Sequence, residues 1–259
     1  MSRNAPLKEM VLGVAFDPVK DFKSVHYGLF WNRIREKFPL CQDAPPLAPS
    51  GRDGSVSIHL TPVSLPRVWY INQAEDRLLQ IQADRFLVNW RKNERSEVYV
   101  GYEACLGWFL EDWNLFQQWL VEEGLGEVKL QQLELSYINQ VSREEMDREM
   151  RRLGDVFPVV RLSDWPVESA LPVPENFACQ FRIVAPDRSG EMLIKLATAV
   201  RHVDQMPLIQ VSFHVTVPIV GTDPDLLKEQ FDAAHHWINF AFKKMISDSA
   251  RETIWERHS

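Results

Sequence analysis

Glycine and cysteine are scarce in this chain. Its 259 residues include 11 glycines and 3 cysteines, and no Gly-rich phosphate loop occurs. The GxSxG, HExxH and protein-kinase patterns of well-known enzyme classes are also missing. Cys41, Cys105 and Cys179 lie far apart and form no CxxC pair, which argues against a zinc knuckle and a thiol redox motif. We therefore predict no catalytic residue of a familiar type and no cofactor, and the pattern favours a non-enzyme.

Long apolar segments are absent as well. No run approaches the roughly 20 apolar residues that a membrane helix needs, and residues 1–8 lack the apolar core of a signal peptide. Hydrophobic residues make up 45% of the chain and charged residues 25%, as in ordinary globular proteins. We expect a cytoplasmic protein that does not bind membranes and that buries a core without a metal or a disulfide.

Charge is distributed unevenly along the chain. The formal net charge is −7, which argues against nucleic acid as the partner. Between Glu103 and Glu149 there are eleven acidic and three basic residues, a balance of −8, so the remainder carries +1. Such a stretch is typical of a solvated helix surface, and it would also attract a basic protein partner.

Apolar periodicity predicts the elements of the first half. Helical periodicity predicts helices over residues 22–38 and 105–124, and the proline- and glycine-rich residues 41–54 are predicted to be a loop. Alternation predicts one early strand and four later ones in quick succession, which must pair antiparallel because their connections are short. These strands are expected over residues 10–16, 56–60, 68–71, 78–82 and 86–91, the last two forming a hairpin.

The second half continues with strands and two further helices. A strand over residues 128–138, with a bulge near Gln131, precedes a helix that has clear capping signals. Ser142 and Glu145 form a capping box, and Gly154 is placed to end that helix. Four prolines indicate a linker over residues 158–176. The remaining expected elements are strands over residues 177–185, 192–200 and 208–217 and a long helix from Pro224.

This order of elements favours an α+β fold in which antiparallel sheet is covered by helices on one side. We divide the chain into an N-terminal α+β half (residues 1–157), a proline-rich linker (158–176) and a C-terminal half of strands plus the long helix (177–259). The halves can also form one continuous domain. Each half ends a run of strands with a long apolar helix, which suggests a divergent duplication.

The hairpin carries the strongest candidate for a binding surface. Asn89 and Arg91 share one face of their strand, whereas Trp90 points to the other face. An arginine and a tryptophan of the neighbouring strand can join them to bind a ligand or a peptide by stacking and hydrogen bonds. In the alternative interpretation, Trp90 packs in the core while Arg91 covers apolar surface and pairs with an acid. The candidate binding residues are Arg67, Trp69, Arg85, Asn89 and Arg91.

Histidines offer weaker candidates. Asp232 and His236 lie four residues apart on one face of the last long helix, a spacing that can hold a metal ion. A site needs a third ligand, which the sequence does not place nearby, so we expect no metal there. His214, on the polar face of its strand, is expected to be hydrogen-bonded or solvated.

Several short segments are the most distinctive parts of the chain. They are Asn4-Ala5-Pro6-Leu7, Phe38-Pro39 with Pro45-Pro46-Leu47, the hairpin Leu78-Leu79-Gln80-Ile81-Gln82 with Asp84-Arg85-Phe86 and Asn89-Trp90-Arg91, and the late Ile254-Trp255. Together they resemble a sporadically distributed family of uncharacterised bacterial proteins of roughly this length, over most of the chain. The resemblance implies no activity and no catalytic residue, and the patchy distribution implies an accessory gene, as in defence or immunity.

The leading hypothesis is a non-enzymatic cytoplasmic protein that recognises a protein partner through its sheet face or its acidic helices. The alternative is a small-ligand-binding protein or an unfamiliar enzyme. Its pocket would lie between the sheet and the long helices, with polar groups from Arg67, Asn89 and Arg91. Nucleic-acid binding through the more basic strands ranks last because of the net charge.

Overall fold

The computed structural model describes residues 6–47, 65–93, 99–142, 153–160, 171, 176–201, 204–219 and 224–252. Three features of the sequence analysis lie wholly or largely outside these residues. They are the strand over residues 56–60, the capping box at residues 142–145 and most of the linker over residues 158–176.

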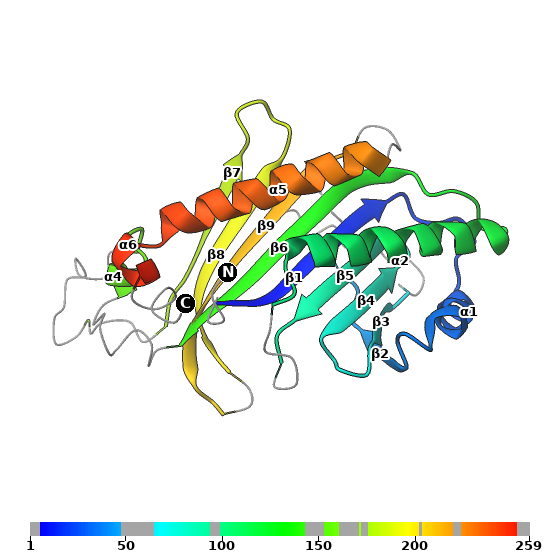
Figure 1. The fold of residues 1–259 in the computed structure, drawn as a ribbon, viewed down its shortest axis with the longest axis horizontal. Helices are drawn as coiled ribbons and strands as arrows, with labels where there is room; N and C mark the ends of the chain where they lie inside the picture. The colour runs from blue at the N-terminus through cyan, green and yellow to red at the C-terminus, as the bar shows by residue number, and fades with distance from the viewer. Residues whose placement is uncertain are drawn as a thin grey trace.

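Nine strands form one antiparallel sheet, whose order is β2-β3-β4-β5-β1-β6-β9-β8-β7 (Figure 1). This confirms the predicted α+β class with an antiparallel sheet. The strands are β1 (Leu7–Phe16), β2 (Leu40–Ala44), β3 (Arg67–Ile71), β4 (Arg77–Gln82), β5 (Arg85–Arg91), β6 (Leu130–Ser142), β7 (Ala178–Val184), β8 (Glu191–Val200) and β9 (Pro207–Pro218).

The two halves of the chain are arranged alike around a central pair of strands, with five described strands in the first half and four in the second. β1 and β6 pair with each other in the middle of the sheet, so the sheet runs without a break through both halves. The last strand of each half returns to lie beside the first strand of that half, because β5 pairs with β1 and β9 pairs with β6. A long helix follows in each half, α2 (Tyr102–Glu122) after β5 and α5 (Pro224–Met245) after β9.

The long helices cover the same face of the sheet. Figure 1 shows α2 (green) and α5 (orange) both in front of the strands, with α2 against β1 and β5 and α5 against β6 and β9. The first helix, α1 (Ser24–Ile34), joins this layer through Phe30, whose ring lies 5.3 Å from the ring of Phe116 on α2. Two short helices, α4 (Leu153–Val156) and α6 (Asp248–Ala250), contact each other.

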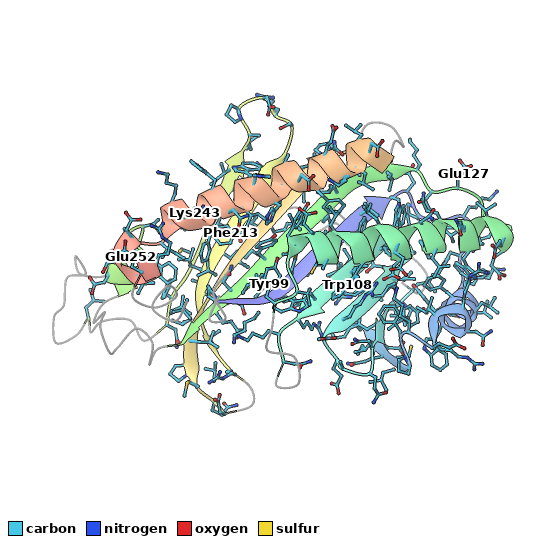
Figure 2. All side chains as sticks on the ribbon, in the orientation of Figure 1. Tyr99, Trp108, Glu127, Phe213, Lys243 and Glu252 are labelled. Carbon is cyan, nitrogen blue, oxygen red and sulfur yellow. The ribbon has the colours of Figure 1, made fainter. Side chains whose placement is uncertain are left out.

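An aromatic core fills the space between the sheet and the helices. The ring of Phe86 on β5 lies 5.3 Å from that of Trp113 on α2, and the ring of Phe213 on β9 lies 5.9 Å from that of Phe242 on α5. Figure 2 marks Phe213 beneath α5. Large rings bury much apolar area and therefore contribute strongly to stability. The fully buried aromatic residues include Phe30, Phe38, Tyr70, Phe86, Trp90, Phe109, Phe116, Trp119, Phe157, Phe213 and Phe231.

Local sequence signals explain several element boundaries. The predicted bulge in β6 is confirmed. Ala15 of β1 pairs with Gln132 and Phe16 pairs with Leu130, so Gln131 is an extra residue with no opposite residue on β1. Helix α2 is followed by Gly124 at a φ of 73°, a left-handed conformation that glycine adopts without a steric penalty. Both features are read correctly from residue type and spacing alone.

Two local predictions are wrong. Residues 41–44 were expected in a loop but belong to β2, whose backbone pairs with β3 at the edge of the sheet. Most of its side chains are exposed, so no apolar alternation marks the strand. Gly154 was expected to end a helix but lies inside α4, where a Cβ atom would approach the carbonyl oxygen of Val160 to 2.9 Å. Close packing therefore requires this glycine.

Candidate binding face

The sheet has a second face, opposite α1, α2 and α5, which we call the open face because no described helix packs on it, although Leu78, Gln80, Leu87 and Asn89 on this face are less than 5% exposed. On β5 the side chains of Val88 and Trp90 point into the core, and Trp90 is 0% exposed. The alternate residues Asn89 and Arg91 therefore lie on the open face, as predicted from the period of two. Within the described residues, α1, α2 and α5 all pack on the other side of the sheet.

Arg67 and Trp69 of β3 lie on the same open face. The guanidinium carbon of Arg91 lies 4.9 Å from the centre of the Trp69 ring, and that of Arg67 lies 5.4 Å from it. Contacts of this length between a cation and an aromatic ring are attractive. The structure thus brings together two arginines and the tryptophan that the sequence analysis selected.

A chain of hydrogen bonds connects Asn89 and Arg91 to two residues that the sequence analysis missed. Arg91 Nε and Asn89 Nδ2 both donate to Glu9 Oε1, at 2.8 Å and 2.5 Å. Gln80 Nε2 donates to Asn89 Oδ1 at 2.7 Å. Glu9 comes from β1, which is paired with β5, so only the strand order reveals it. We call the set of Glu9, Arg67, Trp69, Gln80, Asn89 and Arg91 the Trp69 cluster.

Three atoms of this cluster are buried without a hydrogen-bond partner. They are Arg67 Nε, Trp69 Nε1 and Gln80 Oε1. Among the described residues the Arg67 side chain forms no ion pair, and it contacts the Trp69 ring. Burial lowers the pKa of Arg67, and the neighbouring cations Arg85 and Arg91 lower it further, against a smaller opposing effect of Glu9. The positive charge of Arg67 is therefore poorly compensated within the fold.

Arg85, the fifth predicted residue, lies on the open face but outside this cluster. Its Nε lies 3.5 Å from Glu134 Oε1 on β6, and both side chains are almost completely buried. Nearby, Ser136 Oγ and His214 Nδ1 form a hydrogen bond of 2.7 Å, which confirms the expectation that His214 is hydrogen-bonded. The pKa of His214 is lowered, mainly by burial, because burial disfavours the charged imidazole.

Arg91 itself follows the alternative interpretation of the sequence. It pairs with Glu9 and covers part of Trp69, while Trp90 packs in the core. The proposal of a pocket between sheet and helices that is lined by Arg67, Asn89 and Arg91 is wrong in its choice of residues. These three side chains lie on the opposite face, because Val88 and Trp90 occupy the helix-facing positions of β5.

The helix-covered face contains a buried ion network instead. Asp112 of α2 is 2% exposed and binds both Arg77 of β4 and Lys37, with a distance of 2.9 Å from Lys37 Nζ to Asp112 Oδ1. Arg77 also lies over the ring of Trp108, with its guanidinium carbon 4.6 Å from the ring centre. Glu111 pairs with Lys37 as well, at 2.9 Å. Part of the acidic stretch is thus neutralised internally, and Asp112 is not on a solvated surface.

Asp232 and His236 are engaged in hydrogen bonds, one of which joins α5 to α2. Asp232 Oδ1 accepts a hydrogen bond from the hydroxyl of Tyr102 at 2.8 Å, and Lys228 Nζ donates to Asp232 Oδ2 at 3.0 Å. His236 Nδ1 lies 2.7 Å from the backbone oxygen of Asp232. No group of three His, Cys, Asp or Glu residues is placed to hold a metal ion in the part of the chain that the structure describes.

His235, which the sequence analysis passed over, lies at the junction of α2, α5 and β6. Its ring stacks on that of Tyr102, with 3.9 Å between the centres, and its Nδ1 is hydrogen-bonded to the hydroxyl of Tyr137. Asn239 Nδ2 lies 3.0 Å from its Nε2. Burial and the neighbouring His236 lower the pKa of His235 to about 4, so the ring is neutral near pH 7.

Comparison of the chain with family models, with curated proteins and with solved structures gave no match. Within the described residues, no helix combines the length and the apolar character that crossing a membrane requires. A function is therefore inferred from the chemistry of the two faces of the sheet.

Proposed function

We propose that this chain is a non-enzymatic cytoplasmic binding protein that recognises a protein partner through the Trp69 cluster on the open face of its sheet. The observation that best supports the proposal is the electrostatic environment of the Arg67 guanidinium group. This arginine is crowded by two other arginines, pairs with no acid among the described residues and has a buried Nε without an acceptor. A poorly compensated charge of this kind costs free energy in the fold. Because the Arg67 side chain as a whole is only half-buried, an acidic group of a partner can approach its guanidinium group and compensate the charge.

The acidic helices are the weaker candidate for the binding surface. The acids of α2 already bind bases of the same chain, since Asp112 binds Arg77 and Lys37, and Glu122 Oε2 lies 2.5 Å from Arg33 Nη1. Their attraction for a basic partner is reduced accordingly. The resemblance to a patchily distributed bacterial family supports an accessory role for such a binding protein.

The proposal is tested by affinity capture from a lysate of the native host at low salt. Three baits are compared: the wild type, Arg67→Glu, and Lys244→Glu as a control for charge reversal on the exposed side of α5. We expect one stoichiometric protein to be captured by the wild type and by Lys244→Glu and to be lost with Arg67→Glu. Capture that is equal for all three baits, or no captured protein at all, would overturn the proposal.

A further inference from the structure

The strand β7 forms one edge of the sheet, at the opposite end from β2 (Figure 1). It pairs with β8 on one side, and no other described strand lies on its outer side. Most of its side chains are exposed to solvent, namely those of Ala178, Gln180, Arg182, Ile183 and Val184. This edge is therefore accessible from outside the fold, and an accessible edge strand is a surface on which another strand can pair.

The hydrogen bonds to β8 show which backbone groups of β7 point outward. Phe177 O accepts from Thr198 N at 3.0 Å, and Ala185 N donates to Gly190 O at 2.9 Å. The register between β7 and β8 has no shift, and the direction of the backbone groups alternates along an antiparallel strand, so the odd-numbered residues bond to β8. The N–H and C=O groups of the even-numbered residues point away from the sheet, and these residues are Ala178, Gln180, Arg182 and Val184.

The strand lacks the features by which edge strands usually avoid pairing. It contains no proline and no lysine, and Arg182 is its only charged residue. That charge is already paired, since Arg182 Nε lies 3.1 Å from Glu191 Oε2 on β8. On the helix-covered side, Phe181 packs partly against the core, whereas Ile183 is 42% exposed. The edge therefore combines outward-pointing backbone groups with exposed apolar surface.

We infer that β7 pairs antiparallel with β7 of a second copy of this chain, with Phe181 on the twofold axis. In this register Gln180 lies opposite Arg182 of the second copy, and Ala178 lies opposite Val184. These residues have outward-pointing backbone groups, so they form the hydrogen-bonded pairs of the new ladder. Gln180 can accept from the guanidinium group opposite it, and no like charges face each other.

The side chains between these pairs are also self-complementary. The two Phe181 rings meet in a non-hydrogen-bonded pair, in which side chains approach most closely, and the exposed Ile183 lies opposite Cys179 of the second copy. The neighbouring registers are poorer. With Arg182 on the axis, two guanidinium groups would face each other, and with Gln180 on the axis, Val184 would lie opposite Asn176, which is outside β7.

Such a dimer is closed, because a twofold axis uses the same edge of both copies. It continues the nine-stranded sheet from one copy into the next. The Trp69 cluster lies on β1, β3, β4 and β5, away from β7, so each copy keeps its own cluster. The inference goes beyond the proposed function, and its failure would leave that proposal unaffected.

The oligomeric state is tested by sedimentation equilibrium of the wild type, Gln180→Lys and Gln118→Lys. The last variant is the matched control, because it makes the same change at an exposed glutamine of α2. We expect the wild type and the control to dimerise, and Gln180→Lys to dimerise about tenfold more weakly, because two symmetric contacts then place a lysine opposite Arg182. A wild type that stays monomeric up to about 100 μM, equal dimerisation of all three proteins, or species that grow beyond a dimer would overturn the inference.

The register is tested by cross-linking to the native Cys179. Ile183→Cys places a thiol opposite Cys179 of the second copy, at a Cα separation of about 4.5 Å, which a disulfide can span. Val184→Cys is the matched control, since Val184 is a similarly exposed neighbour that lies opposite Ala178. After mild oxidation with oxidised glutathione, we expect peptide mass spectrometry to find a link between positions 179 and 183 in Ile183→Cys and no link through β7 in Val184→Cys. Links through β7 in both variants, or in neither, would overturn the pairing about Phe181.

Discussion

The two faces of the sheet deal with buried charge in opposite ways. On the helix-covered face, Asp112 and Arg77 are buried, and Arg77 and the half-buried Lys37 both bind the carboxylate of Asp112. On the open face, Arg67 lies beside Trp69 and pairs with no acid of the part of the chain that the structure describes, although its Nε is also buried. Folding alone favours the first arrangement, because a charge removed from water is costly unless it is paired. This contrast is the reason why the proposed partner is placed on the open face and not on the helix-covered face.

Two neighbouring residues of β5 that lie on opposite faces of the sheet test this comparison most clearly. For them we expect the largest difference in the free energy of unfolding. Trp90→Ala should lower the free energy of unfolding by roughly 4 kcal/mol, because it removes a fully buried ring and leaves a cavity in the core. Arg91→Ala should cost about 1 kcal/mol, since its side chain is 31% exposed and loses only the contacts with Glu9 and Trp69. Urea unfolding measures both values, and similar values for the two variants would contradict the assignment of the faces.

A somewhat smaller difference is expected between two neighbouring acids of α2. Asp112→Ala should cost roughly 3 kcal/mol because it leaves Arg77 buried beside Trp108 without its carboxylate. Glu111→Ala is the matched control, with an exposed ion pair to Lys37 that contributes less than about 1 kcal/mol. If the two substitutions destabilise equally, the ion network on the helix-covered face is not buried as described.

Acidification should lower the stability of the folded protein, because His235 on the helix-covered face is held neutral and resists protonation. Its pKa is about 4 in the folded protein and near 6.5 in the unfolded chain, so the unfolded chain binds the proton more readily. The stability that depends on neutral His235 is fully present above pH 6.5 and is lost as the pH falls from 6.5 through 4. We expect the melting temperature to fall between pH 7 and pH 5, and to fall less in His235→Gln, whose side chain does not titrate. His214 adds a loss in the same direction, so part of the fall remains in the variant. An identical fall in both proteins would contradict the role given to His235.

The elements of the fold could be predicted largely from sequence periodicity, but the partners of the functional side chains could not. Alternation placed Asn89 and Arg91 on one face and Trp90 on the other, because it depends only on the geometry of a single strand. Glu9 and Gln80 were missed, since their contacts arise from pairing between β1, β5 and β4. The edge strand β2 was missed for a related reason, because its exposed side chains carry no pattern and only its pairing with β3 defines it.

The smallest expected effect tests the central claim most directly, and it requires no knowledge of the partner. Arg67→Gln removes a charge that two neighbouring arginines oppose more strongly than Glu9 favours it, and that forms no ion pair among the described residues. If Arg67 is held for a partner and not for the fold, the free energy of unfolding should stay within about 0.5 kcal/mol of the wild-type value or rise slightly. A urea-unfolding measurement at pH 7 that shows a loss of more than about 1 kcal/mol would show that Arg67 stabilises the fold. That result would contradict its assignment to a binding face.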